Sequence, residues 1–163
     1  SSELCASGYE VATTKTPAGE TMRLVEVYPH PALLSLLKKT RRVEYKVGKS
    51  KKYWPERDVR DRIAALLEEL SAIYRAIERV FGPLGFNLPS HGDVPNLAHL
   101  KRYEDALDAL VCAWVGVEYL QLRAVPLGDK TAAIWCPSDV VHGQCRVRPW
   151  SENSGIKSPA TRC

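Results

Sequence analysis

Hydrophobic residues recur along the chain at the spacing of three helices. The longest pattern covers residues 55–81, where apolar positions follow one another at intervals of three and four. This stripe consists of Val59, Ile63, Leu66, Leu67, Leu70, Ile73, Tyr74 and Ile77. A shorter helix is predicted over residues 31–39, which begin with a proline that suits a first helical turn. The third helix is predicted over residues 96–121.

Polar and apolar residues alternate in residues 22–28 (MRLVEVY), which predicts a strand ending at the prolines that follow it. Residues 43–47 predict a further short strand. Residues 122–125 and 132–135 predict a hairpin across the turn sequence PLGDKT. Helices and strands are therefore mixed along the chain, and the expected fold class is α/β.

The segments outside these patterns are polar and contain several glycines and prolines. Residues 1–20 and 82–92 are expected to be loops, and residues 138–163 a weakly ordered polar tail. Residues 1–137 then form the domain. An interior strand such as 22–28 needs neighbours on both edges, and this chain supplies few of them. We expect a second copy in a homo-oligomer, or an N-terminal segment outside this sequence, to complete the sheet.

Composition limits the class of protein. At 163 residues and 45% hydrophobic content the chain can bury a sizeable core, in which Cys112, Trp114 and Trp135 are expected to lie. The five cysteines form no C-x-x-C pair, so neither a zinc cage nor a disulfide framework is expected, and the reducing cytoplasm fits best. No apolar run approaches the ~18 residues of a membrane span, and the start of the chain lacks the apolar region of a signal peptide.

The modest net charge of +4 hides a strongly basic segment, residues 38–52, with eight basic residues and a single acid, Glu44. Aromatic residues, among them Tyr53 and Trp54, interleave with or follow the cations. Such a composition suits contact with nucleic-acid phosphates and bases, although a solvated lysine-rich loop is the alternative. The candidate nucleic-acid-binding residues are Arg41, Arg42, Tyr45, Lys46, Lys49, Lys51 and Lys52.

Acidic residues in the third predicted helix suggest chemistry. Residues 106–117 (ALDALVCAWVGV) contain one polar side chain, Asp108, in a stretch that is apolar on every side and therefore expected to be buried. A carboxylate buried there needs a cationic partner or a metal ion. Asp105 stands three residues earlier, so both carboxylates project from neighbouring positions of the helix.

Glu26 interrupts the predicted strand on the face that also carries Leu24 and Tyr28. If the third helix packs across that end of the sheet, Glu26 and the two helix aspartates converge. Clustered carboxylates suit Mg²⁺ or Mn²⁺. In the alternative interpretation, Glu26 pairs with an arginine such as Arg23 or Arg41, and the helix acid pairs with a buried arginine or lysine.

The histidines are less informative than the acids. His30 stands between two prolines just after the strand, close to the candidate site, where it could orient a water molecule or a phosphate. His91 and His142 fall in loops, and His99 falls at the start of the third helix. These three are expected to be structural or solvated.

Four stretches together resemble a family of unknown function that is predicted to consist of RNase H-like nucleases. They are the sequence VEVYPHPALLSLL, the pair Tyr45 and Lys46, the helix sequence YEDALDALVCAW and the closing sequence LGDKTAAIWCP. The resemblance covers about residues 20–137. It implies an RNase H-like architecture, in which the final helix carries an acidic D-x-x-D motif, as in RuvC-type resolvases.

The resemblance implies that Asp105 and Asp108 are metal ligands and that Glu26 is the acid of the strand. Family members similar to this chain begin with a strand that bears an early aspartate beside glycines, followed by a hairpin and an I-D-x-P strand. None of these stretches is present in this sequence. The chain therefore resembles the C-terminal part of the domain, and a two-metal site on this part alone would be incomplete.

Two functions are expected from these observations. The first is a metal-dependent nuclease, in which Glu26, Asp105 and Asp108 bind Mg²⁺ or Mn²⁺, water attacks phosphorus and Lys46 contacts the nucleic-acid backbone. The second is a non-catalytic nucleic-acid-binding or scaffold module, in which Asp108 is a partner in a structural salt bridge.

Overall fold

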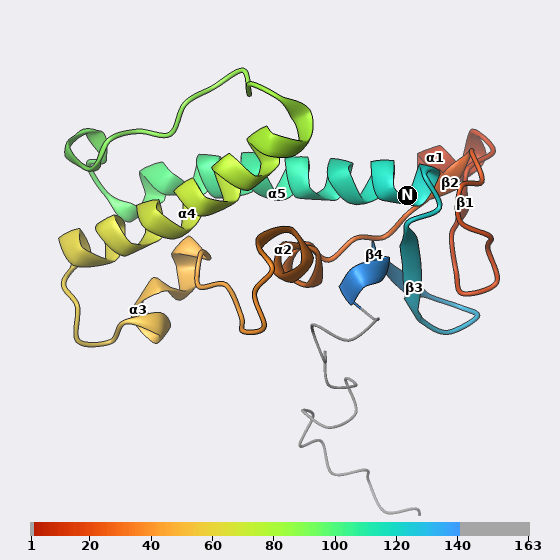
Figure 1. Cartoon of the computed structure of the whole chain (residues 1–163), viewed down its shortest axis with the longest axis horizontal. Helices are drawn as coiled ribbons and strands as arrows, with labels where there is room; N and C mark the ends of the chain where they lie inside the picture. The colour runs from red at the N-terminus through yellow and green to blue at the C-terminus, as the bar shows by residue number, and fades with distance from the viewer. Residues whose placement is uncertain (1, 141–163) are drawn as a thin grey trace, which may run out of the picture.

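The computed structural model describes residues 2–140, which form five helices, three 3₁₀ turns and four short strands (Figure 1). The helices are α1 (Ser2–Ala6), α2 (Pro29–Leu37), α3 (Ser50–Tyr53), α4 (Val59–Phe81) and α5 (Leu97–Leu120). The strands are β1 (Glu10–Val11), β2 (Arg23–Leu24), β3 (Ala124–Gly128) and β4 (Ala133–Pro137). The 3₁₀ turns are η1 (Val47–Lys49), η2 (His91–Asp93) and η3 (Ser138–Val140).

The long helices α4 and α5 lie side by side and run in the same direction, and the loop between them leads the chain back to the start of α5 (Figure 1). Helix α2 packs against both of them, and β4 packs against α2 and α5. The core lies between these four elements. It includes the predicted stripe of α4, in which Ile63, Leu66, Leu70, Ile73 and Ile77 are buried.

Helix α4 begins at Val59, four residues later than the pattern predicted, because the Asp58 side chain accepts a hydrogen bond from the backbone N–H of Asp61 at 2.8 Å. Such a cap satisfies one of the free N–H groups at a helix start. Val59 lies outside the core and is 46% exposed, so its place in the predicted stripe was wrong. Helix α5 matches its predicted bounds within one residue.

The four strands form two small sheets. Strands β1 and β2 pair in parallel, and β3 and β4 form the predicted antiparallel hairpin, displaced by about two residues along the chain. A single parallel bridge joins Glu26 to Ile134, with the Trp135 N–H donating to the Glu26 carbonyl at 2.8 Å. The mixture of helices and small sheets is consistent with the α/β class.

Three local predictions were wrong. Residues 43–47 form no strand, because their polar groups contact the side chains of α5 instead of a neighbouring strand. The strand predicted over 22–28 is reduced to β2 and the bridge at Glu26. The first twenty residues hold α1 and β1 as well as loops. In the predicted tail, residues 138–140 form η3, and residues 141–163, with His142, lie outside the described residues.

Helix α5 is not buried on every side, as its composition had predicted. Leu107 and Val111 are fully buried, whereas Ala109 and Ala113 are exposed on the opposite side. Alanine faces water at little cost, so a stretch without polar residues can still form a half-buried helix. The half-buried Asp108 lies at the border between the two sides.

Other core predictions were confirmed or refined. Trp114 and Trp135 are buried, as expected, and Cys112 is half-buried with a free thiol. Cys136, which is fully buried, is also a free thiol. Between residues 2 and 140, none of the helices has the length and hydrophobicity needed to cross a membrane.

Candidate functional site

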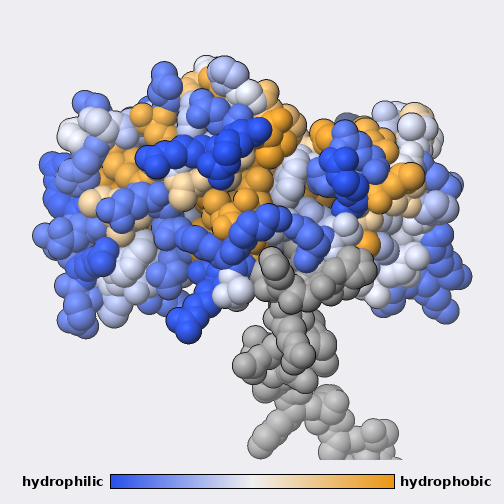
Figure 2. Space-filling view, in the orientation of Figure 1, coloured by the Kyte–Doolittle hydropathy of each residue, from blue (hydrophilic) through white to orange (hydrophobic). Residues whose placement is uncertain are grey.

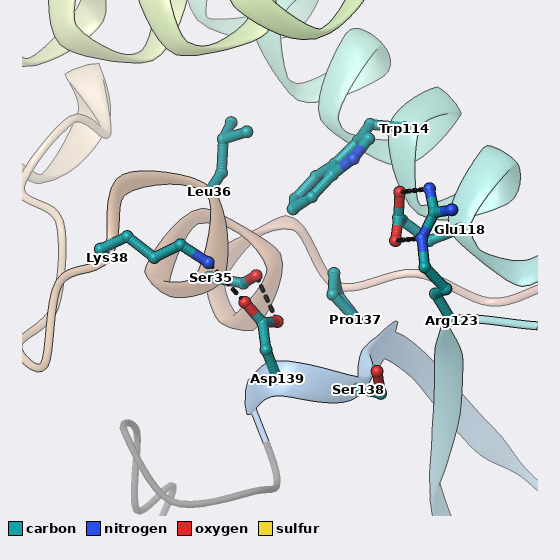
Figure 3. Close-up of a pocket in the computed structure, with 9 residues that line it drawn as sticks. All are labelled: Ser35, Leu36, Lys38, Trp114, Glu118, Arg123, Pro137, Ser138 and Asp139. Atoms are coloured by element: carbon teal, nitrogen blue, oxygen red, sulfur yellow. Dashed lines mark hydrogen bonds and ion pairs between the residues drawn. The ribbon is translucent and has the colours of Figure 1, made fainter.

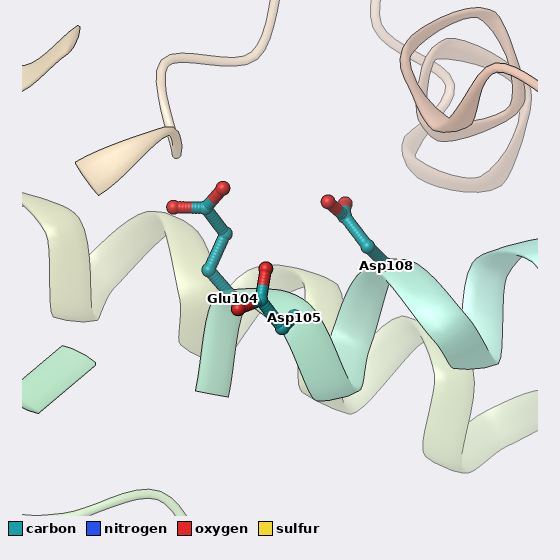
Figure 4. A group of neighbouring side chains, drawn as sticks. All are labelled: Glu104, Asp105 and Asp108. Atoms are coloured by element: carbon teal, nitrogen blue, oxygen red, sulfur yellow. The ribbon is translucent and has the colours of Figure 1, made fainter. Parts of the chain in front are cut away.

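Three carboxylates gather within little more than one turn of α5. Oxygen atoms of Glu104, Asp105 and Asp108 lie within 4.8 Å of one another. Figure 4 shows the side chains of Glu104 and Asp108 leaving the same side of the helix, with Asp105 beside Glu104. Their side-chain exposures differ widely, at 3% for Glu104, 19% for Asp108 and 60% for Asp105. The group therefore extends from the core to the surface.

The 45–47 segment, consisting of Tyr45, Lys46 and Val47, holds the two less exposed carboxylates. The Tyr45 hydroxyl donates to Asp108 Oδ1 at 2.7 Å, and the Lys46 ammonium contacts Asp108 Oδ2. The same ammonium lies 3.2 Å from Glu104 Oε1. The backbone N–H of Val47 donates to Glu104 Oε2 at 2.8 Å. Three consecutive residues thus bind two carboxylates with a phenol, an ammonium and an amide.

Lys101 approaches the group from the exposed side. Lys101 stands about one helical turn before Glu104 and Asp105 on α5. Its ammonium contacts Asp105 Oδ1 and lies 3.2 Å from Glu104 Oε1. Two cations therefore face three carboxylates, and Glu104 interacts with both. The group retains a net negative charge.

Burial and charge shift the pKa values around these carboxylates. Burial lowers the pKa of Lys46, but its contacts with Asp108 and Glu104 outweigh burial, so the pKa is raised above its usual value. Burial and the hydrogen bond to Asp108 raise the pKa of Tyr45. Lys46 is therefore charged and Tyr45 neutral at physiological pH. Both remain donors to Asp108.

The donor set fits a hard divalent cation, because all three side chains offer carboxylate oxygens at mutually close positions. A carboxylate oxygen has two lone pairs, so oxygens that accept one hydrogen bond can accept a further interaction. The Lys46 ammonium lies against both Glu104 and Asp108. A metal ion placed between those two carboxylates would have to displace it.

The third residue of the group is not the one that the sequence predicted. Asp105 and Asp108 are brought together as expected, whereas Glu26 is exposed and is not a member of the group. Arg23, one candidate partner of Glu26, pairs instead with Glu10 and with Glu20. The alternative interpretation expected a basic partner for Asp108, and Lys46 is that partner.

Glu104 was missed by sequence reasoning, although the sequence held a signal for it. It stands four residues after Leu100 and three before Leu107, both fully buried, so it continues the core-facing stripe of α5. A carboxylate on a buried stripe of a helix needs a partner more than a carboxylate at the edge of that stripe does, because it has less contact with water. The position lies just before the apolar run of residues 106–117, so that run by itself did not indicate it.

The basic segment lies next to the carboxylates through η1, which contacts α5. Hydrophilic side chains cover the surface around α3 and the loop that leads to it from α2 (Figure 2). The exposed cations of this surface are Arg41, Arg42, Lys49, Lys51 and Lys52. Two other lysines pair elsewhere, Lys38 with Asp139 and Lys39 with Glu69.

The aromatic residues of the basic segment differ in accessibility. Tyr45 is 1% exposed and donates to a carboxylate, so it offers no surface for stacking on a base. Trp54 is half-buried, and the guanidinium of Arg57 lies 5.4 Å from its ring centroid. Tyr53 contacts the same indole edge-on.

His30 lies in the first turn of α2, near the basic segment. Burial of its ring, followed by the positive charges of Arg42, Lys46 and Lys49, lowers its pKa from 6.5 to about 4. The imidazole is therefore neutral at physiological pH. No hydrogen bond joins His30 to the three carboxylates among the described residues, and its role near them stays a prediction.

A surface pocket of about 390 Å³ lies farther along α5, beside Trp114 (Figure 3). Its charged groups are paired with one another. Asp139 accepts hydrogen bonds from Ser35 at 2.5 Å and from Lys38 at 2.6 Å. At the other end of the pocket, Arg123 donates to the carboxylate of Glu118. These pairs join the pocket walls, and the pocket contains none of the three clustered carboxylates.

Comparison with known families matches residues 6–131 to the family described as protein of unknown function (DUF429), and the chain belongs to that family. No curated protein and no solved structure matches the chain.

Proposed function

We propose that this chain supplies carboxylate ligands to the divalent-metal centre of a phosphodiesterase that acts on nucleic acid, with an RNase H-like architecture. The observation that carries the proposal is the group formed by Glu104, Asp105 and Asp108, whose oxygens lie within 4.8 Å of one another beside an exposed basic segment. An anionic metal site and a cationic surface for phosphates are the two parts that such a reaction needs.

Each residue has a role set by its position. Glu104 and Asp108, held by the 45–47 segment, would be the fixed ligands, and the exposed Asp105 would complete the group from the solvent side. A bound Mg²⁺ or Mn²⁺ would supply Lewis acidity to the phosphoryl oxygens and activate water. Glu26 lies outside the group, and we do not assign it a ligand role.

The basic surface would hold the substrate backbone. Arg42 and Lys49 are exposed and lie near the neutral His30, and Lys46 connects this surface to the carboxylates. A neutral imidazole can accept a proton from water or donate a hydrogen bond to a phosphate, so His30 suits a positioning role. Chromatography at increasing salt would detect such a phosphate-binding surface, because phosphate contacts weaken steeply with salt.

The test is a cleavage assay with labelled single- and double-stranded DNA and RNA, in Mg²⁺, in Mn²⁺ and in excess chelator. We expect cleavage that requires the divalent ion and is lost in Asp108→Asn, which keeps an acceptor for the Tyr45 hydroxyl. The matched control is Asp61→Asn, an exposed aspartate in the first turn of α4, which should cleave as the unsubstituted protein does. Cleavage in chelator, or full activity in Asp108→Asn, would contradict the proposal.

A second candidate function rests on a different observation. Both oxygens of Asp108 already have donors, the Tyr45 hydroxyl and the Lys46 ammonium. In this interpretation the contacts are purely structural, and the chain is a non-catalytic nucleic-acid-binding or scaffold module.

Thermal unfolding separates the two candidates. If the ion pair between Lys46 and Asp108 is purely structural, Asp108→Asn lowers the free energy of unfolding by up to about 3–5 kcal/mol. Added Mg²⁺ then changes the melting temperature of neither the unsubstituted protein nor the variant. If the carboxylates bind metal, Mg²⁺ raises the melting temperature of the unsubstituted protein, and the gain is lost in Asp108→Asn.

A further inference from the structure

We propose that Lys46 is an exchangeable counter-ion, which neutralises Glu104 and Asp108 until a divalent cation replaces it and which then becomes available to a nucleic-acid phosphate. Metal binding and nucleic-acid binding are thereby coupled through one side chain. This inference rests on the proposed metal centre and adds a regulatory role for a residue that is not itself a ligand.

The position of Lys46 carries the argument. Its ammonium contacts Asp108 Oδ2 and lies 3.2 Å from Glu104 Oε1, so it occupies the side of both carboxylates that faces the 45–47 segment. A lysine with two such contacts and a divalent ion that uses the same oxygens exclude each other by charge and by volume. The side chain of Lys46 is 28% exposed, so a path to solvent is open when the ammonium leaves.

The neighbours of Lys46 keep the carboxylates in place during the exchange. The Tyr45 hydroxyl binds Asp108 Oδ1, and the Val47 N–H binds Glu104 Oε2, which are the oxygens that Lys46 does not use. These two hydrogen bonds come from groups that do not carry charge, so they do not repel a metal ion. The displaced ammonium is the only cation of the 45–47 segment. Glu104 and Asp105 retain the ammonium of Lys101 as a partner when the Lys46 ammonium leaves.

Linkage sets the direction of the effect. If a metal ion releases Lys46 for contact with phosphate, the metal raises the affinity for nucleic acid, and nucleic acid raises the affinity for the metal by the same factor. At position 46, a residue that holds the carboxylates more firmly than lysine is expected to lower the affinity for the metal ion. An uncharged residue of similar length at that position is expected to raise this affinity.

Two substitutions at one position test these opposite directions. Lys46→Met removes the competing charge, and we expect it to bind Mn²⁺ about 10-fold more tightly than the unsubstituted protein. Lys46→Arg retains the charge and offers a fork that matches two carboxylates, so we expect weaker Mn²⁺ binding. The measurement is the electron paramagnetic resonance signal of free Mn²⁺ during titration, which needs no catalytic activity. The control is Lys130→Met, in the exposed turn between β3 and β4.

The outcomes distinguish this inference from the proposed function. Tighter binding in Lys46→Met and weaker binding in Lys46→Arg support the exchange. Equal Mn²⁺ affinity in all the proteins overturns the exchange and leaves the metal centre intact. Absence of Mn²⁺ binding in every protein overturns the metal centre and the exchange together. If Lys46→Met does not fold, affinity in Lys46→Arg equal to or above that of the unsubstituted protein overturns the exchange.

Nucleic-acid binding provides the second measurement. Fluorescence anisotropy of a labelled, cleavage-resistant phosphorothioate oligonucleotide is recorded with and without Mn²⁺ at constant ionic strength. We expect Mn²⁺ to increase the affinity of the unsubstituted protein and of Lys130→Met, and to leave that of Lys46→Met unchanged. An equal increase in Lys46→Met would show that Mn²⁺ acts elsewhere and would overturn the coupling.

Discussion

Glu104 illustrates how a single buried charge is stabilised at the scale of the residue. Its side chain is 3% exposed, and an uncompensated carboxylate at such a place would be costly. It accepts a backbone hydrogen bond from Val47 and interacts with the ammonium groups of Lys46 and Lys101. All of its partners are donors, and two of them carry positive charge. The cost of burial is thus offset by charge-assisted hydrogen bonds.

The pKa of His30 predicts how stability changes with pH. The folded protein holds this histidine neutral, with its pKa lowered from 6.5 to about 4, whereas the unfolded chain binds a proton near pH 6.5. Unfolding therefore takes up a proton between these two values, and stability falls as the pH decreases through this window. Because the ring is only half-buried, we expect a loss of about 1 kcal/mol, less than the full shift would give.

Urea unfolding at a series of pH values checks this expectation, with His30→Asn as the comparison. The variant cannot take up the proton, so its stability should depend less on pH between 6.5 and about 4. His91→Asn, at an exposed position in η2, is the matched control and should follow the unsubstituted protein. Identical pH dependence in His30→Asn would contradict the lowered pKa.

Helix α5 is the element on which the candidate site depends, because it carries all three carboxylates. Its start is defined by Asn96, whose side-chain oxygen accepts from the backbone N–H of His99 at 3.0 Å. Its buried side, with Leu100, Leu107 and Val111, fixes its rotation against the core. That rotation places Glu104 inward and Asp105 outward.

Asn96→Ala removes the cap and should lower the free energy of unfolding by about 1 kcal/mol, because one N–H in the first turn loses its acceptor. Chemical denaturation measures the change. Asn87→Ala, at an exposed loop position, is the control and should have little effect. Equal stability of the two variants would indicate that the cap contributes nothing.

At the scale of the whole molecule, Trp135 joins parts of the chain that are far apart in sequence. Its backbone N–H donates to the Glu26 carbonyl, and its indole N–H donates to the Ala12 carbonyl at 3.4 Å. The ring packs edge-on against Tyr119, with centroids 4.8 Å apart. Trp135 therefore joins three parts of the chain, which are represented by Ala12, by Glu26 and by Tyr119 at the end of α5.

Trp135→Ala should destabilise the protein by about 3–5 kcal/mol, because it leaves a large cavity and an unpaired carbonyl. Trp135→Phe, which keeps an aromatic ring, should cost less. Differential scanning calorimetry measures both, and Trp54→Ala, at a half-buried position, is the comparison. A smaller loss in Trp135→Ala than in Trp54→Ala would contradict the central role of Trp135.

Local patterns in the sequence predicted some elements of the fold and missed others. The stripe from Ile63 to Ile77 identified α4, and the predicted bounds of 96–121 matched α5 within one residue, because hydrophobic periodicity is local. The strand predicted over 43–47 was wrong, since the consecutive residues Tyr45, Lys46 and Val47 bind side chains of α5 and not a neighbouring strand. Asp105 and Asp108 were found from their helical spacing, whereas Glu104 was overlooked and Glu26 lies elsewhere.

The amino-acid sequence by itself determined the three main helices, the hairpin and the need of Asp108 for a positive partner, since these follow from local spacing and from the cost of a partly buried charge. Only the tertiary structure decided that the partner is Lys46. These two residues are 62 positions apart, and their contact depends on how the 45–47 segment packs on α5. Spacing along a chain carries no information about such an approach, because packing of the whole core brings the two segments together.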